Sequence, residues 1–330
     1  MNTKQLHPSY GVIFYPFFPP ETLADFARQA EAAGFDELWL WDDCFTAGAL
    51  TSATIALAAT QRLKVGIGLM PATVYNPLFA AMEITTLSRA FPQRFMPGFG
   101  YGVPAWMGRI GARPKSFLQA LEETVTAVGR LLRGEQVTLH GTQVHLDEAQ
   151  MWMTPDEPPP LYIGGMRTKT LQLAGRAADG VILTSMSSPG YVRWARQQVE
   201  IGMAQVGRKT SRLVVFVDVK VNPDGEMARA KTRRALAEWL PWEDVLLREA
   251  GIEAEVQRFI DENGAEAVTE GMPDAWLDVL AAAGTPEQVS EALQRLVEAG
   301  ADALVFQPLN GDPDCLDEYA RYLMPVIGKR

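Results

Sequence analysis

Three observations predict that this chain folds as a (β/α)8 TIM barrel, an α/β fold in which eight parallel strands alternate with helices. Short apolar runs alternate with helical patterns along most of the chain. One junction, a helix end of small residues followed by an Asp and an apolar strand, occurs three times, as AEAAGFDELWLWD, LAGRAADGVILTS and LVEAGADALVFQP. The length of 330 residues suits one barrel with insertions, because such barrels commonly exceed about 250 residues.

The strand-like runs are short and apolar, and several end in glycine or in polar residues. The first, YGVIFYP, is typical of a buried strand. We expect strands near 10–16, 37–42, 63–69, 94–100, 161–165, 180–185, 212–221 and 303–309.

The helical segments between these strands repeat apolar residues with a period of 3.6. In the first segment, Leu23, Phe26 and Ala30 share one face, and Gly34 follows the helix end. We expect helices near 21–33, 49–60, 77–90, 116–132, 168–177, 189–205, 286–299 and 314–326.

Two segments exceed a minimal barrel. Residues 136–155 are typical of a small hairpin, and residues 225–283 have helical spacing and lie between the seventh and eighth strands. Neither segment leaves a polar linker that would require a second domain. We therefore expect a single domain over 1–330, in which both insertions are candidate lids.

Composition excludes several classes of function. The net charge of −10 and the pI near 5.0 argue against a nucleic-acid or anionic-membrane partner. No apolar run reaches the roughly 18 residues of a membrane-spanning helix, and the first residues do not resemble a signal peptide. The two cysteines, Cys44 and Cys315, suggest free thiols, so we expect a cytoplasmic protein. With three histidines in the chain, we expect no metal site.

The chemistry of a barrel lies at the carboxyl ends of its strands. The third and fourth strands carry glycines at their ends, where a flat ligand can lie directly against the main chain. We expect these turns to form a cofactor floor, with the candidates Gly68, Leu69, Met70, Gly100 and Gly102.

Two adjacent carboxylates, Asp42 and Asp43, end the second strand. Adjacent residues of a strand point to opposite faces, so we expect the two side chains to have different roles. One of them could face the barrel mouth. Both could instead cap the following helix or remain solvated, as Asp often does in caps and turns.

The segment LYIGGMRTKT places two glycines between a strand and a helix. Backbone N–H groups at a helix N-terminus form an anion site, for which Gly164, Gly165, Met166 and Arg167 are candidates. Thr184 and Ser185 end the next strand, and their hydroxyls could bind the same phosphate. A tight turn without a ligand would leave the same sequence pattern.

Three further residues are candidates for the substrate side. Phe17 follows the first strand, and Trp106 follows the fourth, where it either lines the pocket or packs over the rim. Lys220 ends the seventh strand and is either a Schiff-base nucleophile or a paired structural lysine.

The order of several motifs resembles the luciferase-like monooxygenase superfamily, and within it the branch that uses the deazaflavin coenzyme F420. The motifs are EAAGFDELWLWDD, VGIGLMP with YNP, LSRAFPQRFMPGFGYG and PPPLYIGGMRTKTLQLAGRAADGVIL, which cover most of 10–185. The resemblance implies a TIM barrel, a homodimer and a deazaflavin or flavin at the strand ends. It also implies a non-prolyl cis peptide at Gly68–Leu69, a phosphate loop over 164–167 and a cofactor-contacting Asp42.

The chain departs from this superfamily in one respect. Many members carry Asp-His where this chain has Asp42-Asp43, so Asp43 stands in the place of an acid–base imidazole. A carboxyl group can move protons there if burial raises its pKa. The resemblance therefore assigns the catalytic position to Asp43.

The resulting hypothesis is an F420-dependent oxidoreductase that exchanges a hydride with a small organic substrate. The basic residues Arg109, Arg113 and Lys115, beside Arg167, favour the long anionic tail of F420 over the single phosphate of FMN. An FMN-dependent luciferase-like monooxygenase is the alternative within the family. A cofactor-free TIM-barrel lyase that uses Lys220, or a barrel that binds a ligand without catalysis, is the alternative from another class.

Overall fold

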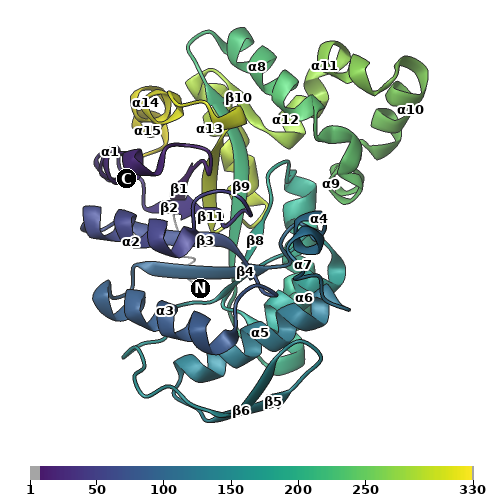
Figure 1. Ribbon diagram of the computed structural model, residues 1–330. Helices are drawn as coiled ribbons and strands as arrows, with labels where there is room; N and C mark the ends of the chain where they lie inside the picture. Colours follow the sequence, from purple (N-terminus) through teal and green to yellow (C-terminus); the bar gives the residue numbers. More distant parts are fainter. Residues whose placement is uncertain (1–7, 329–330) are drawn as a thin grey trace, which may run out of the picture.

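A closed ring of eight parallel strands lies at the centre of the molecule, and helices surround it (Figure 1). The computed structural model describes residues 8–328. In ring order the strands are β1 (Ser9–Phe14), β2 (Glu37–Leu40), β3 (Lys64–Pro71), β4 (Phe95–Gly100), β7 (Tyr162–Gly164), β8 (Gly180–Leu183), β9 (Arg212–Val221) and β11 (Ala303–Pro308), and β11 closes the ring onto β1. The predicted TIM barrel is therefore confirmed, and each of the eight predicted strands overlaps one strand of the ring.

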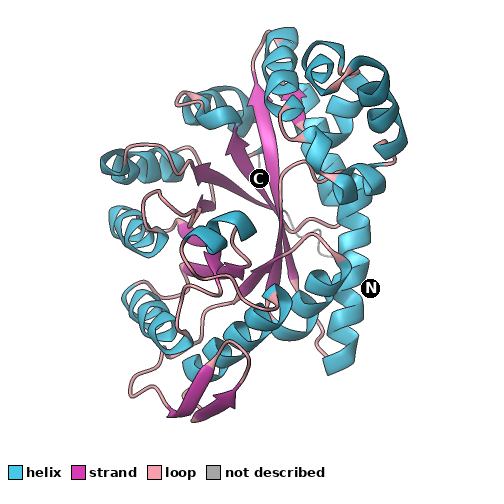
Figure 2. Ribbon diagram, turned by 45° about the vertical axis from the view of Figure 1, so that its right-hand side comes forward, coloured by secondary structure: helices cyan, strands magenta, loops and turns pink. Residues whose placement is uncertain are grey.

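Helices pack around the outside of the ring (Figure 2), and their bounds follow the predicted segments. Side chains of Asn76, Ser116 and Ser188 accept hydrogen bonds from the first backbone N–H groups of three of them. The short helix α4 was not predicted, and the predicted helix over 314–326 is divided into three short turns. The helices are α1 (Leu23–Ala32), α2 (Ala49–Ala59), α3 (Pro77–Ala90), α4 (Pro104–Arg109), α5 (Phe117–Leu132), α6 (Thr168–Ala177), α7 (Pro189–Val206), α13 (Pro286–Glu298), α14 (Cys315–Glu318), the π-helix η5 (Tyr319–Leu323) and α15 (Met324–Ile327). No helix in the part of the chain that the structure describes is long and apolar enough to cross a membrane.

The core has two layers, one inside the ring and one between the ring and the helices. Successive residues of a strand face opposite sides, so each buried strand contributes to both layers. The inner layer consists of Ile13, Trp39, Met96, Tyr162, Ile182, Val214, Phe216, Ala303 and Val305. The larger outer layer holds the aliphatic faces of the helices against the other side of the strands.

One glycine within β3 is explained by the inner layer. A Cβ atom at Gly66 would lie 2.4 Å from the indole of Trp39, which is fully buried in the barrel. The Trp39 Nε1–H donates to Glu37 at 2.9 Å, and Arg212 forms an ion pair with the same carboxylate. Gly66 therefore makes room for an indole that closes the lower part of the barrel, away from the carboxyl ends.

The two segments predicted as insertions have the expected local structure. Residues 136–155 contain an antiparallel hairpin of β5 (Val137–His140) and β6 (His145–Ala149). The segment between β9 and β11 is largely helical, with α8 (Gly225–Ala237), η2 (Leu240–Trp242), α9 (Asp244–Ala250), α10 (Glu253–Asn263), η3 (Ala265–Ala267), α11 (Val268–Gly271) and α12 (Asp274–Leu280).

The helical insertion returns to the sheet through a short strand, β10 (Ala282–Gly284), that was not predicted. Val219 of β9 pairs with Pro308 of β11 and with Ala282 of β10, so these strands lie on opposite edges of β9. The pairing of β9 with β8 stops at Val215. Strand β10 therefore occupies the edge that β8 leaves, and this is where the insertion joins the barrel mouth.

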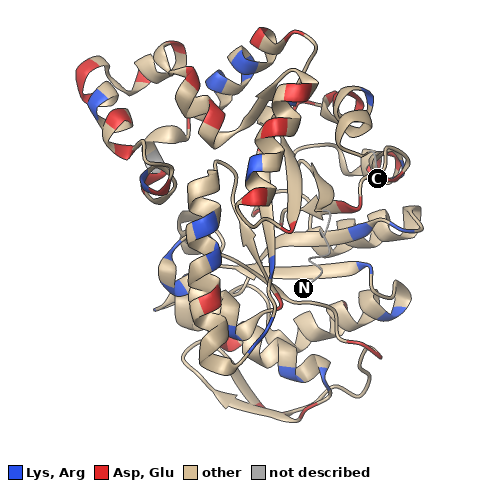
Figure 3. Ribbon diagram, turned by 180° about the vertical axis from the view of Figure 1, so that it is seen from behind, with Lys and Arg blue, Asp and Glu red and all other residues tan. Residues whose placement is uncertain are grey.

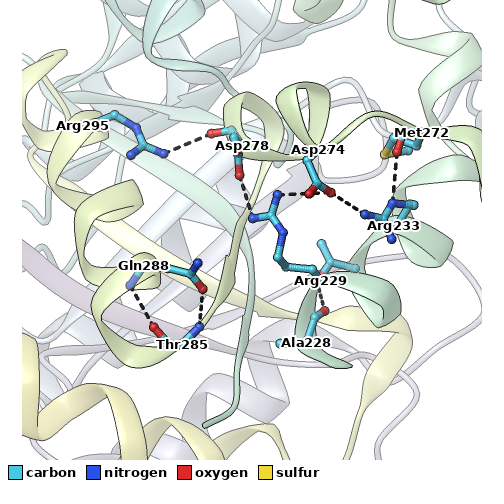
Figure 4. Close-up of polar contacts among 10 residues, drawn as sticks. Ala228, Arg229, Arg233, Met272, Asp274, Asp278, Thr285, Gln288 and Arg295 are labelled. Carbon is cyan, nitrogen blue, oxygen red and sulfur yellow. Dashed lines mark hydrogen bonds and ion pairs between the residues drawn. The ribbon is translucent and has the colours of Figure 1, made fainter. Parts of the chain in front are cut away.

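Ion pairs join two helices of the insertion to each other (Figure 4). The guanidinium of Arg229 on α8 lies 2.7 Å from Asp278 and 3.3 Å from Asp274, both on α12. Arg233, one turn further along α8, contacts Asp274 and also donates to the carbonyl of Met272. These contacts hold α8 and α12 together as one unit beside β10.

Candidate functional site

A large cavity opens at the carboxyl ends of the barrel strands. Its volume is about 1230 Å³, above the roughly 300–1,000 Å³ of typical small-ligand pockets. Strand ends form its wall, and Leu236, Trp239 and Val245 of the helical insertion also line it. The cavity therefore lies where barrel chemistry takes place, and it has room for a cofactor and a second small molecule.

Most of the residues predicted at the strand ends line this cavity. The structure brings together residues that are far apart in the sequence, from the ends of five strands of the ring. They are Asp42, Asp43, Gly68, Leu69, Gly102, Trp106, Gly164, Gly165, Met166, Arg167, Thr184 and Ser185.

Two predicted floor residues do not reach the cavity. Met70 is fully buried in the outer core layer, because it follows Leu69 and faces the other side of β3. Gly100 is covered by a side chain, since a Cβ atom there would lie 2.5 Å from Cδ1 of Leu69. The prediction that these two residues line a cofactor floor is therefore wrong.

The prediction for Phe17 is also wrong. Its side chain is 71% exposed and does not line the cavity. Its ring instead lies 5.6 Å from the ring of Tyr15, and Tyr15 faces the cavity. The aromatic residue that β1 contributes to the site is therefore Tyr15.

Lys220 is a paired structural lysine and lies outside the cavity lining. Its side chain is 2% exposed, and Nζ donates to Asp312 at 2.6 Å and to Glu318 at 2.5 Å. Burial alone would lower the pKa of Lys220, but the two carboxylates raise it above its ordinary value. A charged amine with two anionic partners is a poor nucleophile. This geometry removes the residue on which a Schiff-base lyase would depend.

The wall predicted as bare main chain is covered by one side chain, Leu69. The pairing of β3 with β4 shifts between Ile67 and Met70, and the peptide between Gly68 and Leu69 is cis, as the resemblance implied. A Cβ atom at Gly164 would lie 2.0 Å from Leu69 Cδ1, and one at Gly100 would lie 2.5 Å from the same atom. The glycines of β4 and β7 therefore form a socket for Leu69, and its side chain forms the cavity wall.

The two carboxylates after β2 both line the cavity but have different surroundings. Asp42 accepts a hydrogen bond from the N–H of Ala49 at 3.1 Å, at the start of α2, and another from Tyr75 Oη at 2.6 Å. Asp43 also lines the cavity, and burial together with the nearby Asp42 raises its pKa above the ordinary value. Asp42 is thus held by the protein at a helix start, whereas Asp43 is a carboxyl group that retains its proton to higher pH.

The turn after β7 forms the end of the cavity that suits an anion. Gly164 to Lys169 line it as the chain enters α6, a helix of 10 residues, so backbone N–H groups of its first turn point toward this end. Tyr191 Oη donates to the carbonyl of Met166 at 2.9 Å, and Arg167 forms a 2.9 Å ion pair with Asp244 of α9. The turn is therefore supported by α7 and by the insertion.

The three basic residues expected to bind an anionic tail do not line the cavity. Arg109, Arg113 and Lys115 are absent from its lining, and the guanidinium of Arg109 lies 4.7 Å above the ring of Phe45. The cations that line it are Arg167, Lys169 and, from α9, Arg248. The positive end of the cavity is therefore built by α6 and the insertion.

Sequence reasoning did not assign the buried carboxyl group of Asp218 to the site. Its side chain lines the cavity from β9 although the residue is only 5% exposed. Burial raises the pKa of Asp218 to about 7, and a hydrogen bond from Ser185 partly opposes that rise. The strand alternation could have found it, because Val214, Phe216 and Asp218 face the barrel interior in turn.

Other lining residues were also missed, among them Trp41 after β2 and Glu238, Trp239 and Glu243 in the insertion. Trp41 lies one residue before the predicted pair of carboxylates, so its place at the strand end could have predicted that it lines the cavity. The insertion residues carry no such signal, because their position depends on how the helices fold back over the barrel. Among residues 8–328, no group of His, Cys, Asp and Glu side chains has the arrangement of a metal site.

Comparisons with known proteins agree with this geometry. The family model described as luciferase-like monooxygenase matches residues 1–303. A 5,10-methylenetetrahydromethanopterin reductase of Methanolobus tindarius is 26% identical, over 90% of this chain and 93% of its own length. An F420-dependent glucose-6-phosphate dehydrogenase of Nakamurella multipartita is 29% identical, over 94% of this chain and 93% of its own length.

Solved structures with the same fold include the coenzyme F420 dependent tetrahydromethanopterin reductase from Methanopyrus kandleri. Its TM-score is 0.83 at 21% identity, over 97% of this chain and 99% of that one. An F420-dependent secondary alcohol dehydrogenase in complex with an F420-acetone adduct has a TM-score of 0.75 at 21% identity, over 97% and 99% of the two chains.

Proposed function

We propose that this chain, which belongs to the luciferase-like monooxygenase family, is an oxidoreductase. It would transfer a hydride between coenzyme F420 and a small organic substrate. Relatives that cover at least nine-tenths of the chain are named as an F420-dependent dehydrogenase and a methylenetetrahydromethanopterin reductase. They support F420 over FMN as the cofactor.

One observation carries the proposal. A single cavity joins the wall made by Leu69 to the N-terminus of α6. A ligand with a flat ring and a long anionic tail needs both features, an apolar wall for the ring and backbone N–H groups with cations for the tail. A Cβ atom at Gly165 would lie 2.7 Å from the side chain of Thr170, so the close packing of this turn against α6 requires a glycine.

The residues that would hold the cofactor follow from this arrangement. The turn from Gly164 to Arg167 would bind its phosphate, with the hydroxyls of Thr184 and Ser185 beside it. Leu69 would support the ring, and Asp42, fixed by Tyr75, would contact its polar edge. Gly68 and Gly102 would border the ring on the same side of the cavity. When bound, coenzyme F420 supplies or accepts the hydride.

Asp43 would be the residue that moves a proton. Burial and the neighbouring Asp42 raise its pKa, which brings the carboxyl group closer to the range in which an acid can donate near neutral pH. Trp106 and the insertion residue Trp239 line the same cavity and would exclude water from the reacting atoms.

Titration of the purified protein with F420 and with FMN, followed by fluorescence, tests the proposal. We expect tight binding of F420. Tight binding of FMN without binding of F420 would overturn the choice of cofactor and favour the monooxygenase alternative.

A variant tests the role of Asp43. Once a substrate is found by screening alcohols, carbonyl compounds and amines for a change in deazaflavin absorbance, Asp43→Asn should lower kcat by about 100-fold, the scale of general acid–base catalysis. The affinity for F420 should stay within about threefold, because the amide keeps the shape of the carboxyl group. The surface variant Asp147→Asn is the matched control. An unchanged kcat in Asp43→Asn would remove Asp43 from the mechanism.

The proposal also includes a homodimer and a cytoplasmic location. Ile55 on α2 and Phe79 and Met82 on α3 are exposed apolar side chains on neighbouring outer helices, which supports a second copy as partner. Cys44 and Cys315 are free thiols, which supports a reducing compartment. Light scattering of the purified protein tests the dimer, and a monomer at micromolar concentration would refute it.

A further inference from the structure

Carboxylates outnumber cations in the lining of the cavity. Its cations, Arg167, Lys169 and Arg248, come from the turn into α6 and from α9, where Glu243 and Glu249 also line it. Further carboxylates line it from β2, β9 and the end of α8, at Asp43, Asp218 and Glu238. Figure 3 also shows acidic residues along the helices of the insertion. The cofactor's anionic tail would use the cations, which leaves the acidic end, lined by Asp43, Asp218 and Glu238, for the substrate.

Two of these carboxylates lie near an aromatic surface. Burial raises the pKa of Tyr15, and the nearby charges of Asp43 and Glu238 raise it further, so both carboxylates lie close to its hydroxyl. The Tyr15 ring is 5.8 Å from the ring of Trp41, and both rings line the cavity. Aromatic faces beside carboxylates are the surroundings in which proteins bind organic cations.

The third carboxylate, Asp218, is almost fully buried where it lines the cavity. It is 5% exposed, and Ser185 donates a hydrogen bond to it. A carboxylate has room for several donors. A positively charged ligand beside it would lower its pKa from about 7 and favour the ionised form.

Two of the three cations that line the cavity already have acidic partners. Arg167 is paired with Asp244, and Arg248 with Glu253 at 3.0 Å. The third, Lys169, lies in the first turn of α6, at the end proposed for the cofactor tail. A phosphorylated substrate at the acidic end would therefore meet like charges, which opposes binding.

Resting on the proposed function, we infer that the substrate of this site carries a protonated or quaternary nitrogen, which Asp43, Asp218 and Glu238 bind against the rings of Tyr15 and Trp41. Sugar phosphates, the substrates in the names of several relatives, are the class that this end of the cavity excludes.

Binding of benzyltrimethylammonium to the F420-loaded protein tests the inference, with glucose 6-phosphate as the anionic probe and calorimetry as the readout. We expect the ammonium probe to bind and glucose 6-phosphate not to bind. Glu238→Gln should weaken the ammonium probe by about three- to fivefold, the scale of one partly exposed ion pair. Glu291→Gln, an exposed carboxylate on α13, should leave its affinity unchanged.

Three results would overturn the inference. They are binding of glucose 6-phosphate, absence of binding of the ammonium probe, and equal affinity of the ammonium probe for the wild type and Glu238→Gln. Glu238 is exposed, so its substitution leaves the packed core intact. Binding of F420, measured first, separates the two proposals: if F420 binds and the ammonium probe does not, the inference fails while the proposed function stands.

Discussion

Substitution of Asp218 by Asn should make the chain more stable at neutral pH and change how its stability depends on pH. Burial raises the pKa of Asp218 from 3.8 to about 7 in the folded chain. Between these two values, the folded state keeps a proton that the unfolded state has released. The free energy of unfolding therefore falls as the pH rises through this range. Asn has no proton to lose there, and its amide oxygen can still accept the hydrogen bond from Ser185.

The size of the effect follows from the same values. Each pH unit between 3.8 and about 7 corresponds to about 1.4 kcal/mol, so the wild type loses up to about 4 kcal/mol relative to the variant by neutral pH. The entropy of unfolding is about 2.1 cal/mol/K per residue, or about 0.7 kcal/mol/K for 330 residues. The variant should therefore melt about 6 °C above the wild type at pH 8 and near the same temperature at pH 4.

Thermal unfolding followed by circular dichroism between pH 4 and pH 8 measures this difference. The two curves should meet at acid pH and separate as the pH rises. Asp147→Asn, at an exposed position on β6, is the matched control and should melt with the wild type at every pH. Melting curves for Asp218→Asn and the wild type that stay parallel across the range, or a variant less stable at pH 8, would refute the assignment of a buried, protonated carboxyl group.

Two further predictions concern the wall and the paired lysine. Gly164→Ala places a Cβ atom 2.0 Å from Cδ1 of Leu69. The displaced leucine should narrow the cavity and weaken F420 binding by more than about tenfold, the scale of an overpacking cost of 1–3 kcal/mol. An unchanged affinity in fluorescence titration would contradict this account of the wall. Lys220→Met leaves Asp312 and Glu318 without their shared cation and should lower the free energy of unfolding by about 3 kcal/mol. Denaturant unfolding measures this free energy. A loss below about 0.5 kcal/mol would show that the ion pairs of Lys220 are dispensable.

The fold could be predicted from the sequence because its signals are local. Period-3.6 helices, apolar strands and the repeated helix-to-strand junction are each contained within a few residues. Strand β10 was missed because the three residues Ala282–Gly284 pair with β9 only through a contact more than 60 residues away. The local sequence of a short segment of small residues does not predict such a pairing.

The site could be predicted as far as strand order determines it. The turn at Gly164 and the carboxylates Asp42 and Asp43 lie at strand ends and were found. The error at Gly100 came from reading a strand-end glycine as exposed main chain, whereas in the structure this glycine accommodates Leu69 of the neighbouring strand. Met70 follows Leu69 and therefore faces the other side of β3. The acidic residues of the insertion were missed because tertiary packing alone brings them to the barrel mouth.

The socket around Leu69 makes three positions on three strands depend on one another. Gly100 and Gly164 each leave space that this one leucine fills. A larger residue at Gly100 or Gly164 is compatible only with a smaller residue at position 69, so single changes there are penalised and paired changes are tolerated. Shortening Leu69 would deepen the cavity without moving a strand. The depth of the pocket could thus change among descendants of this chain through paired substitutions at Leu69 and a glycine of its socket. The barrel around the pocket would stay the same.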